Sequence, residues 1–330
     1  METTHTSDIL KKLMWRQQVK GGMSVYGVID IGSNSIRLSV FQVEEGGGLT
    51  QLFQRKEMTG LAACVNEKGN LTRQGVRRAA DTLERFRWAL EKILVEETFV
   101  FATALLRNVG NTKEVVQELF RQTGYQVQVL SGREEALLDY RGARLSLGGG
   151  DGLLVDIGGG STELVGFRQG KAEFAVSMPV GSLNLYKRCV SDLLPTQEEL
   201  RKIRQTVRRE LERQDLPKDF QAELLCGVGG TARNTCKLCN EWFGRPSEER
   251  GFTDKELKHM MDRCKHPDKE HMDSLLAVMP ERIHTITPGM AILQTVARRF
   301  GCRQFVVSQQ GVREGYLLEI LSKRGRAHVG

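Results

Sequence analysis

The sequence is poor in aromatic residues and contains no long apolar run. Phenylalanine, tryptophan and tyrosine make up 6% of the 330 residues. No stretch of about 20 apolar residues occurs, so no membrane-spanning helix is expected. The chain also lacks a zinc finger, a helix-turn-helix signature and a basic stripe interleaved with aromatics, which disfavours nucleic-acid binding despite a formal net charge of +7. An acidic small molecule or polymer suits that charge better.

The cysteines and histidines do not form the spaced patterns that usually bind metals. The seven cysteines are an odd number, and no signal peptide is recognised, which favours a reduced, cytoplasmic setting. Cys236 and Cys239 form a lone C-x-x-C, and on a helix both thiols would lie on one face. We therefore expect a buried pair rather than a redox or metal site. The 6 histidines form no H-x-x-x-H pair, which argues against a histidine-based metal centre.

The sequence does contain a repeated segment, Asp-Ile-Gly-x-x-Ser, at residues 30–35 and again at 156–161. Each copy lies between two strand-like runs, which predicts a strand, a tight turn and a second strand. Glycine allows a ligand to approach the backbone closely, and successive amide N–H groups form an anion-binding nest. An aspartate beside phosphate is favourable when a hydrated cation lies between them. Two such turns indicate two related domains that close on one phosphate-bearing ligand.

The rest of the pattern predicts two α/β halves joined near the glycines at 148–150. In the first half, strands are expected at 24–43 (with the first turn), 49–59, 98–103 and 126–130, and helices at 72–94, 111–124 and 132–147. Ser131 and Glu134 form a capping-box pair at the start of the third helix. Residues 8–20 fit either a basic amphipathic helix or a frayed tail, and Met23 could be an alternative start.

In the second half the hairpin pattern restarts at 153–167. Strands are then expected at 172–179, 224–228 and 304–308, and helices at 197–214, 254–264, 272–278, 288–300 and 311–323. The helix at 288–300 is expected to begin near Pro288, since proline favours the first turn.

Six ordered motifs resemble the exopolyphosphatase / guanosine pentaphosphate phosphatase family of the actin-like ATPase superfamily. They span about residues 24–325 and occupy 27–38, 102–107, 131–136, 156–164, 227–231 and 311–315. One glycine-rich turn would be weak support, whereas six motifs in order and spacing are strong. The resemblance is to the short, two-domain form.

The resemblance implies an α/β fold with two actin-like (ribonuclease H-like) domains, each a mixed β-sheet with flanking helices, and an interdomain cleft. We expect an N-terminal extension at 1–23, domain I at 24–138 plus 313–330, and domain II at 139–312. The two turns should face each other across the cleft. The last helix should cross back to domain I, because each sheet needs a helix to cover it.

Catalytic and metal roles are carried over from the family motifs. Glu135 matches the family's catalytic base, although the sequence alone would favour an ordinary first-turn helix glutamate. Arg107 matches a phosphate-binding arginine. Asp156 and Glu163 are the expected carboxylate ligands of Mg²⁺ or another divalent cation. Asp30 either holds the metal through water or caps its own turn.

The expected phosphate-binding residues lie in both turns, in a later Gly-Gly-Thr loop and among the arginines. They are Ser33, Asn34, Ser35, Arg37, Gly158, Gly159, Gly160, Ser161, Gly229, Gly230, Thr231, Arg282 and Arg313. The loop glycines could equally be plain turn glycines, and a surface salt bridge is the alternative for each arginine. The chain departs from the family's frequent Ser, Arg and Asp at Ala104, Asn184 and His284.

The implied activity is hydrolysis of terminal phosphoanhydride bonds in inorganic polyphosphate, guanosine pentaphosphate or both, by metal-assisted in-line attack of water. Such chemistry would connect the protein to the stringent response. A kinase of a small acceptor and a non-enzymatic sensor of alarmone nucleotides are the alternatives on this fold. We expect a cytoplasmic homodimer without nucleic-acid or membrane partners.

Overall fold

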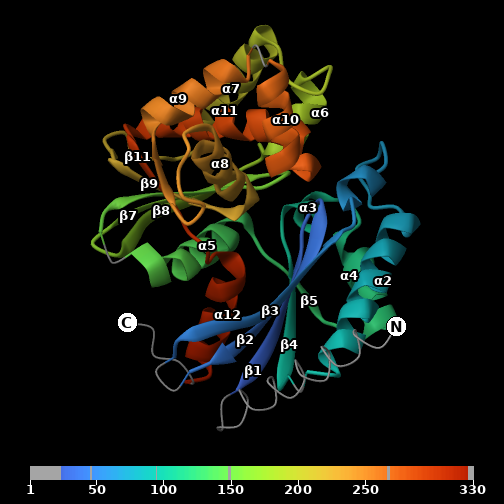
Figure 1. The fold of residues 1–330 in the computed structure, drawn as a ribbon. Coiled ribbons are helices and arrows are strands. Elements are labelled where there is room, and N and C mark those ends of the chain that lie inside the picture. Colours follow the sequence, from blue (N-terminus) through green and yellow to red (C-terminus); the bar gives the residue numbers. More distant parts are fainter. Residues whose placement is uncertain (1–23, 45–46, 94, 148–149, 266–267, 326–330) are drawn as a thin grey trace, which may run out of the picture.

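The structure is a computed structural model that describes residues 24–44, 47–93, 95–147, 150–265 and 268–325. The expected N-terminal extension, with its possible helix and Met23, lies outside the described residues. Within the described part of the chain, no helix is long and apolar enough to cross a membrane. The chain forms two halves, each a mixed sheet flanked by helices, as predicted (Figure 1).

The first half is built on a five-stranded sheet of order β3-β2-β1-β4-β5. Its strands are β1 (Val25–Ile31), β2 (Ser35–Val43), β3 (Leu49–Met58), β4 (Glu97–Ala102) and β5 (Val127–Val129). The first three are antiparallel, and β1, β4 and β5 are parallel. One face packs against η1 (Leu61–Cys64), α2 (Arg73–Leu90), α3 (Ala104–Asn108) and α4 (Thr112–Thr123).

The second sheet repeats this topology. Its order is β10-β11-β9-β6-β7-β8, and the last five strands have the same neighbours and directions as β5, β4, β1, β2 and β3. The strands are β6 (Gly152–Ile157), β7 (Thr162–Arg168), β8 (Lys171–Met178), β9 (Leu224–Val228), β10 (Gly251–Thr253) and β11 (Gln304–Val307). The repeated segment in the sequence therefore marks a repeated structural unit.

One face of the second sheet is covered by a thick layer of helices that forms the largest core. They are α6 (Ser182–Cys189), α7 (Gln197–Arg213), α8 (Gly229–Trp242), α9 (Asp254–Arg263), α10 (Lys269–Val278) and α11 (Ile283–Phe300), with η2 (Pro280–Arg282) before α11. Cys236 and Cys239 are free thiols inside this core, which confirms the expectation of a buried pair.

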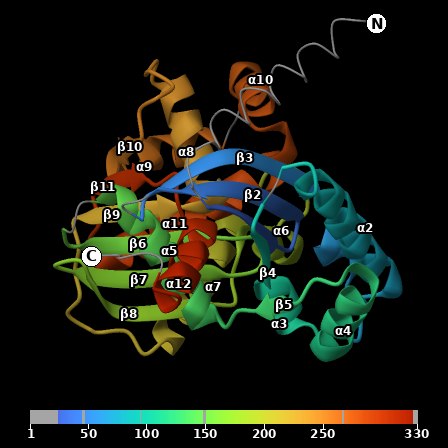
Figure 2. The same cartoon turned by 90° about the horizontal axis from the view of Figure 1, so that it is seen from below.

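Helices α5 (Gly132–Leu147) and α12 (Val312–Lys323) join the two halves and lie side by side (Figure 2). Their backbones touch: a Cβ atom on Gly315 would lie 1.8 Å from the carbonyl oxygen of Leu138. Leu138 packs in the core of the first sheet with Leu317 of α12, while Tyr140 packs on the second sheet. The last helix thus returns to the first half, as predicted, and the expected boundary at 138/139 falls inside α5.

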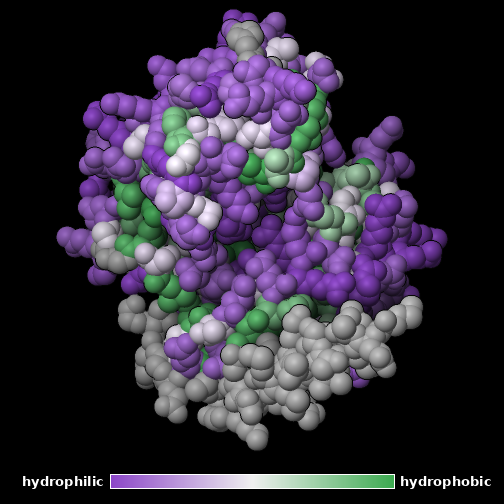
Figure 3. All heavy atoms as spheres, in the orientation of Figure 1, coloured by the Kyte–Doolittle hydropathy of each residue, from purple (hydrophilic) through white to green (hydrophobic). Residues whose placement is uncertain are grey.

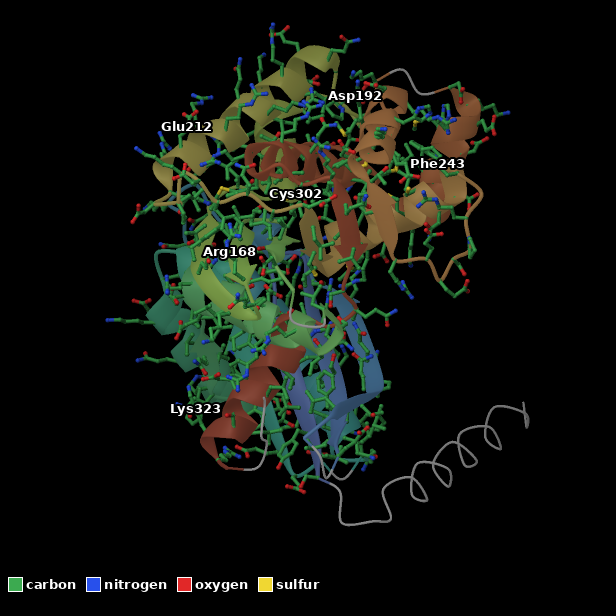
Figure 4. All side chains as sticks on the ribbon, turned by 90° about the vertical axis from the view of Figure 1, so that its left-hand side faces the viewer. Arg168, Asp192, Glu212, Phe243, Cys302 and Lys323 are labelled. Carbon is green, nitrogen blue, oxygen red and sulfur yellow. The ribbon has the colours of Figure 1, made fainter. Side chains whose placement is uncertain are left out.

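The expected start of α11 near Pro288 is wrong. The helix begins at Ile283, with Pro288 inside it. Pro288 cannot donate a hydrogen bond to the carbonyl one turn earlier. Ile283 and Ile286 are buried in the core of the second half, and this apolar burial offsets the lost hydrogen bond. Figure 4 shows Cys302, just after α11, in the second half, and Lys323, at the end of α12, beside the first.

Candidate active site

The two glycine turns have the same local structure. Each turn connects two antiparallel strands of a hairpin, and each closes with a hydrogen bond from the glycine N–H to the carbonyl of the serine three residues later. The bonds are Gly32 to Ser35 (3.1 Å) and Gly158 to Ser161 (3.0 Å). The two copies of the motif therefore fold by the same local interactions, as the sequence predicted.

The two turns face each other between the halves. A Cβ atom on Gly159 would lie 3.7 Å from the Cβ of Ser33, and one on Gly160 would lie 3.5 Å from the Ser33 hydroxyl. This proximity confirms the predicted arrangement. The amides and hydroxyls of both turns are thus gathered in one place, which suits a small, highly charged anion.

Glu135 and Arg107 form the central ion pair of the site. Glu135 is buried on the first turn of α5, and its Oε2 accepts a hydrogen bond from Arg107 Nη1 at 2.7 Å. The same nitrogen donates to the carbonyl of Leu130 at 3.0 Å. Burial raises the pKa of Glu135 to about 7, and the nearby Arg107 lowers it only in part. A carboxyl with this pKa can accept a proton near neutral pH.

The start of α5 is pressed against β8, which brings Glu135 close to Glu163. A Cβ atom on Gly132 would lie 2.4 Å from the Cβ of Ser177, so this contact requires glycine. Ser177 donates to Glu163 Oε1 at 2.6 Å, and Arg107 Nη2 lies 3.8 Å from the same oxygen. Arg107 therefore lies between the two carboxylates.

Asp156 and Glu163 are direct cross-strand neighbours in the β6–β7 hairpin. Burial raises the pKa of each carboxyl; nearby Glu135 raises that of Glu163 further, whereas Arg233 lowers that of Asp156. A Cβ atom on Gly229 would lie 2.1 Å from Asp156 Oδ1, which explains the glycine at the first residue of α8.

The oxygen donors of this pair fit Mg²⁺. Two carboxylates supported by serine hydroxyls are hard ligands, and Mg²⁺ commonly takes one or two carboxylates while keeping waters or substrate phosphates as its other ligands. Among the described residues, no group of three or more His, Cys, Asp or Glu side chains could hold an ion alone. Asp156 and Glu163 therefore suit an ion shared with a phosphate-bearing substrate.

Asp30 occupies the equivalent position in the first hairpin, opposite Arg37. Burial raises the pKa of Asp30, whereas Arg37 and Arg313 lower it. Arg313 is buried on α12 and donates to the hydroxyl of Ser39 at 2.8 Å. The three charged groups thus form a cluster behind the first turn, in which both arginines favour the ionised form of Asp30, while burial and the like-charged neighbour Arg313 lower the pKa of Arg37.

A basic cleft of about 450 Å³ lies beside the turns, between β2–β3 of the first half and α8–η2 of the second. Figure 3 shows a hollow near the centre of this face, bordered mainly by hydrophilic residues. The lining residues of the basic cleft are Arg37, Gln54, Lys56, Gly230, Arg233, Asn234, Lys237, Val278, Met279, Pro280, Glu281 and Arg282. Five are basic, one is acidic and none is aromatic.

Two of the sequence-predicted arginines, Arg37 and Arg282, line this cleft, but the sequence reasoning missed Arg233. Arg282 lies against the backbone of Gly230, since a Cβ atom there would be 2.7 Å from the guanidinium carbon. The segment Gly229–Thr231, expected as a loop, forms the first turn of α8. Arg233 follows it and lowers the pKa of Asp156. Its position two residues after Thr231 was a signal in the sequence.

Lys56 and Lys237 also line the basic cleft and were not predicted. Lys56 pairs with Glu281 at 2.7 Å, which joins β3 to η2 across the cleft. Thr231 plays a different part, because its buried hydroxyl donates to the carbonyl of Ile157 at 2.8 Å. The hydroxyl proton of Thr231 is therefore already used within the fold.

A second cavity, of about 310 Å³, also borders the turns and shares no lining residue with the basic cleft. We call it the apolar cavity, because most of its wall is aliphatic. Its lining residues are Ser33, Ala62, Val65, Gly69, Ala104, Leu105, Asn108, Val109, Gly159, Gly160, Leu183, Asn184 and Lys187. The site is therefore open to two chemically different cavities.

Asp139 is a further acidic residue that the sequence reasoning missed. It is fully buried one turn after Glu135, and neither carboxyl oxygen has a hydrogen-bond partner within normal limits. Burial raises its pKa well above the ordinary value, and Asp156 and Glu135 raise it further. Burial thus opposes ionisation of Asp139, and its spacing of four from Glu135 was the available signal in the sequence.

Comparison with known proteins gives consistent matches along most of the chain. A model of the Ppx/GppA phosphatase family matches residues 39–324. Exopolyphosphatase 1 of Mycobacterium tuberculosis and of Mycobacterium bovis is 25% identical over 301 residues, covering 89% of this chain and 88% of each relative. The crystal structure of the Ppx/GppA family member from Aquifex aeolicus superposes with a TM-score of 0.78 at 26% identity, covering 93% and 100% of the two chains.

A similar fold occurs in an exopolyphosphatase from Cytophaga hutchinsonii, with a TM-score of 0.79 at 20% identity and coverage of 93% of this chain and 100% of that one.

Proposed function

Because the chain belongs to the Ppx/GppA phosphatase family, we propose that it hydrolyses terminal phosphoanhydride bonds, with inorganic polyphosphate as its preferred substrate. The observation that carries the proposal is Glu135, a buried carboxyl with a pKa of about 7 that is held by Arg107 beside two facing anion-binding turns. A base, positive charge and phosphate-binding amides are the components that phosphoryl transfer to water requires.

Glu135 is the base in this proposal. The terminal phosphoryl group lies between the two turns, and a water molecule in line with the scissile bond donates a hydrogen bond to the Glu135 carboxylate. The water oxygen forms a bond to phosphorus, the phosphoanhydride oxygen leaves with the shortened chain, and the water proton passes to Glu135. The products are orthophosphate and a chain that is one phosphate shorter.

Positive charge near the transferred group supports the same reaction. Arg107 lies between Glu135 and Glu163, where its guanidinium can stabilise charge that develops on the phosphoryl oxygens. Asp156 and Glu163 would hold Mg²⁺, which supplies electrostatic stabilisation of the transferred phosphoryl when bound. The raised pKa values of both carboxyls reflect burial without enough counter-charge, a deficit that a cation would relieve.

The basic cleft favours polyphosphate over guanosine pentaphosphate. Arg37, Arg233 and Arg282 supply charge along a groove beside the turns, which suits a repeating anion. Proteins commonly bind a nucleobase by stacking it on an aromatic side chain, and neither the basic cleft nor the apolar cavity has an aromatic lining residue.

Initial rates of phosphate release test the proposal. Long-chain polyphosphate, tripolyphosphate and guanosine pentaphosphate are compared with Mg²⁺ and with excess chelator, without any acceptor. We expect the highest kcat/KM on long-chain polyphosphate and loss of activity in chelator. Product formation only with an acceptor would indicate a kinase, and binding of guanosine pentaphosphate without turnover of any substrate would indicate a sensor. Either result would contradict the proposed function.

A further inference from the structure

If the proposed function holds, the shortened chain in the basic cleft poses a problem for product release. After cleavage, the shortened chain remains among the cations of the basic cleft. To leave by that cleft, orthophosphate formed between the turns would then have to pass a bound chain that is also negatively charged. A separate route would allow release without loss of the chain.

The apolar cavity provides such a route. Ser33, Gly159 and Gly160 line it, so it opens directly onto both turns. Its wall continues with Ala104, which is close to the turn: a Cβ atom on Gly160 would lie 3.7 Å from the Ala104 Cβ. The cavity therefore begins at the point where the terminal phosphoryl group is expected to lie.

Away from the turns, the polar side chains in the wall of the apolar cavity are two uncharged amides, Asn108 and Asn184, and one lysine. Ala62, Ala104 and Leu183 present aliphatic surface. The side chain of Asn184 is already engaged: its Nδ2 donates to the carbonyl of Gly160 at 2.9 Å, and its Oδ1 accepts from the Gly181 amide at 2.8 Å. Asn184 thus fixes the turn instead of offering a free donor.

Lys187 is the one cation among the residues that line this cavity. Its side chain is exposed on α6, and no ion pair involves it within the described parts of the chain. A single exposed positive charge attracts a small anion without binding it tightly, because solvent screens the interaction. The cavity therefore leads from the turns to a solvent-exposed, weakly attractive rim.

We propose that the apolar cavity is the port through which orthophosphate leaves the active site while the shortened chain remains in the basic cleft. Chain and product then use different openings, and the next terminal phosphate can advance to the turns without dissociation. The ligand class of the port is free orthophosphate.

A plug variant with a matched control tests the port. Ala62 lines the cavity and is half-buried, whereas the adjacent Ala63 is exposed and does not line it. We expect Ala62→Phe to lower kcat on long-chain polyphosphate about tenfold, because product release becomes limiting. The single-turnover cleavage rate should stay at the wild-type value, and a burst of phosphate should precede the steady state. Ala63→Phe should match wild type in every measurement.

A charge-reversal variant provides a second test, which does not depend on whether Ala62→Phe folds. Lys187 lines the port and its neighbour Arg188 is exposed outside it. Added orthophosphate should inhibit wild type non-competitively, because it enters through the port and binds enzyme that still holds the shortened chain in the basic cleft. Lys187→Glu should weaken that inhibition severalfold, and Arg188→Glu should leave it unchanged.

Three results would overturn the port. In the first, Ala62→Phe behaves like Ala63→Phe. In the second, the single-turnover rate of Ala62→Phe falls together with kcat, which would assign the cavity to substrate. In the third, orthophosphate competes directly with polyphosphate and Lys187→Glu does not change its inhibition. Each of these results is compatible with hydrolysis by wild type, so each would contradict the proposed port and leave the proposed function standing. Absence of phosphate release by wild type would instead refute the proposed function, and the port with it.

Discussion

Replacing Glu135 with glutamine is the most direct test of the catalytic assignment. Glutamine has nearly the same shape and retains an oxygen that can accept the hydrogen bond from Arg107, which now spans 2.7 Å. It cannot accept a proton from water. The variant thus removes the basic function while it keeps the packing at the start of α5.

The expected loss can be estimated from the role of the side chain. A general base contributes about 10²–10⁴-fold to the rate, which is about 3–5 kcal/mol of activation free energy. We therefore expect kcat of Glu135→Gln to fall by that factor, with KM for polyphosphate little changed, because Glu135 is not among the residues that line the basic cleft.

Although the substitution should lower activity, it should not lower the melting temperature at alkaline pH. Raising the carboxyl pKa from 4.5 to about 7 corresponds to about 3 kcal/mol. Because the folded-state pKa is raised, the protonated Glu135 stabilises the fold below pH 4.5, and this contribution is lost as pH rises through about 7. Glutamine stays neutral, so the variant should melt no lower than wild type in alkaline buffer.

The assay is phosphate release from long-chain polyphosphate as a function of pH, with thermal melting in the same buffers. Wild-type kcat should rise as pH passes through about 7, where Glu135 loses its proton, and this limb should be absent in the variant. Glu134→Gln is the matched control, since Glu134 occupies the same turn but is exposed and accepts from the Ser131 amide at 2.7 Å. A wild-type rate in Glu135→Gln, or an equal loss in Glu134→Gln, would refute the assignment.

Three further variants test other parts of the site. Asp139→Asn should melt progressively higher than wild type as pH rises above the ordinary carboxyl range, because the raised pKa of Asp139 makes its ionisation destabilising; parallel melting curves would contradict this. Glu163→Ala should lose at least about 10²-fold in kcat and need more Mg²⁺ for half-maximal activity, whereas unchanged Mg²⁺ titrations would remove Glu163 from the metal site. Arg233→Met should raise KM for long-chain polyphosphate about tenfold with a shallower salt dependence, and an unchanged KM would exclude Arg233 from substrate binding.

Local sequence signals predicted those parts of the fold that local interactions determine. The two glycine turns form identical backbone hydrogen bonds, so six residues were enough to identify each hairpin. The start of α5 is fixed by the reciprocal bonds of Ser131 and Glu134. The repeat of these units then predicted two similar sheets, which the strand orders confirm.

Elements that depend on tertiary packing were not predictable in the same way. The short helices α3 and α6 were not anticipated, since a helix of one or two turns has little intrinsic stability. Helix α11 begins before Pro288 because its first turn is buried in a core made of residues distant in sequence. No local pattern encodes that burial.

The residues of the candidate site also fall into those that local motifs predict and those that tertiary packing brings together. Glu135, Asp156 and Glu163 belong to motifs and were anticipated, although their roles remain predictions. Arg233 and Lys56 were missed because their place at the cleft depends on how the two halves pack. Lys56 meets Glu281, 225 positions away, and such a pairing leaves no spacing pattern in the sequence.

Helix α5 links the catalytic geometry to the arrangement of the two halves. Its Leu138 belongs to the core of the first sheet and its Tyr140 to that of the second. A Cβ atom on Gly142 would lie 2.0 Å from the carbonyl oxygen of Gly311, so α5 and the start of α12 are in backbone contact. Because Glu135 projects from the first turn of this helix, which is packed against both halves, any rotation of one half against the other must move the proposed base relative to one of the turns. The position of Glu135 relative to both turns therefore depends on how the two halves pack against α5.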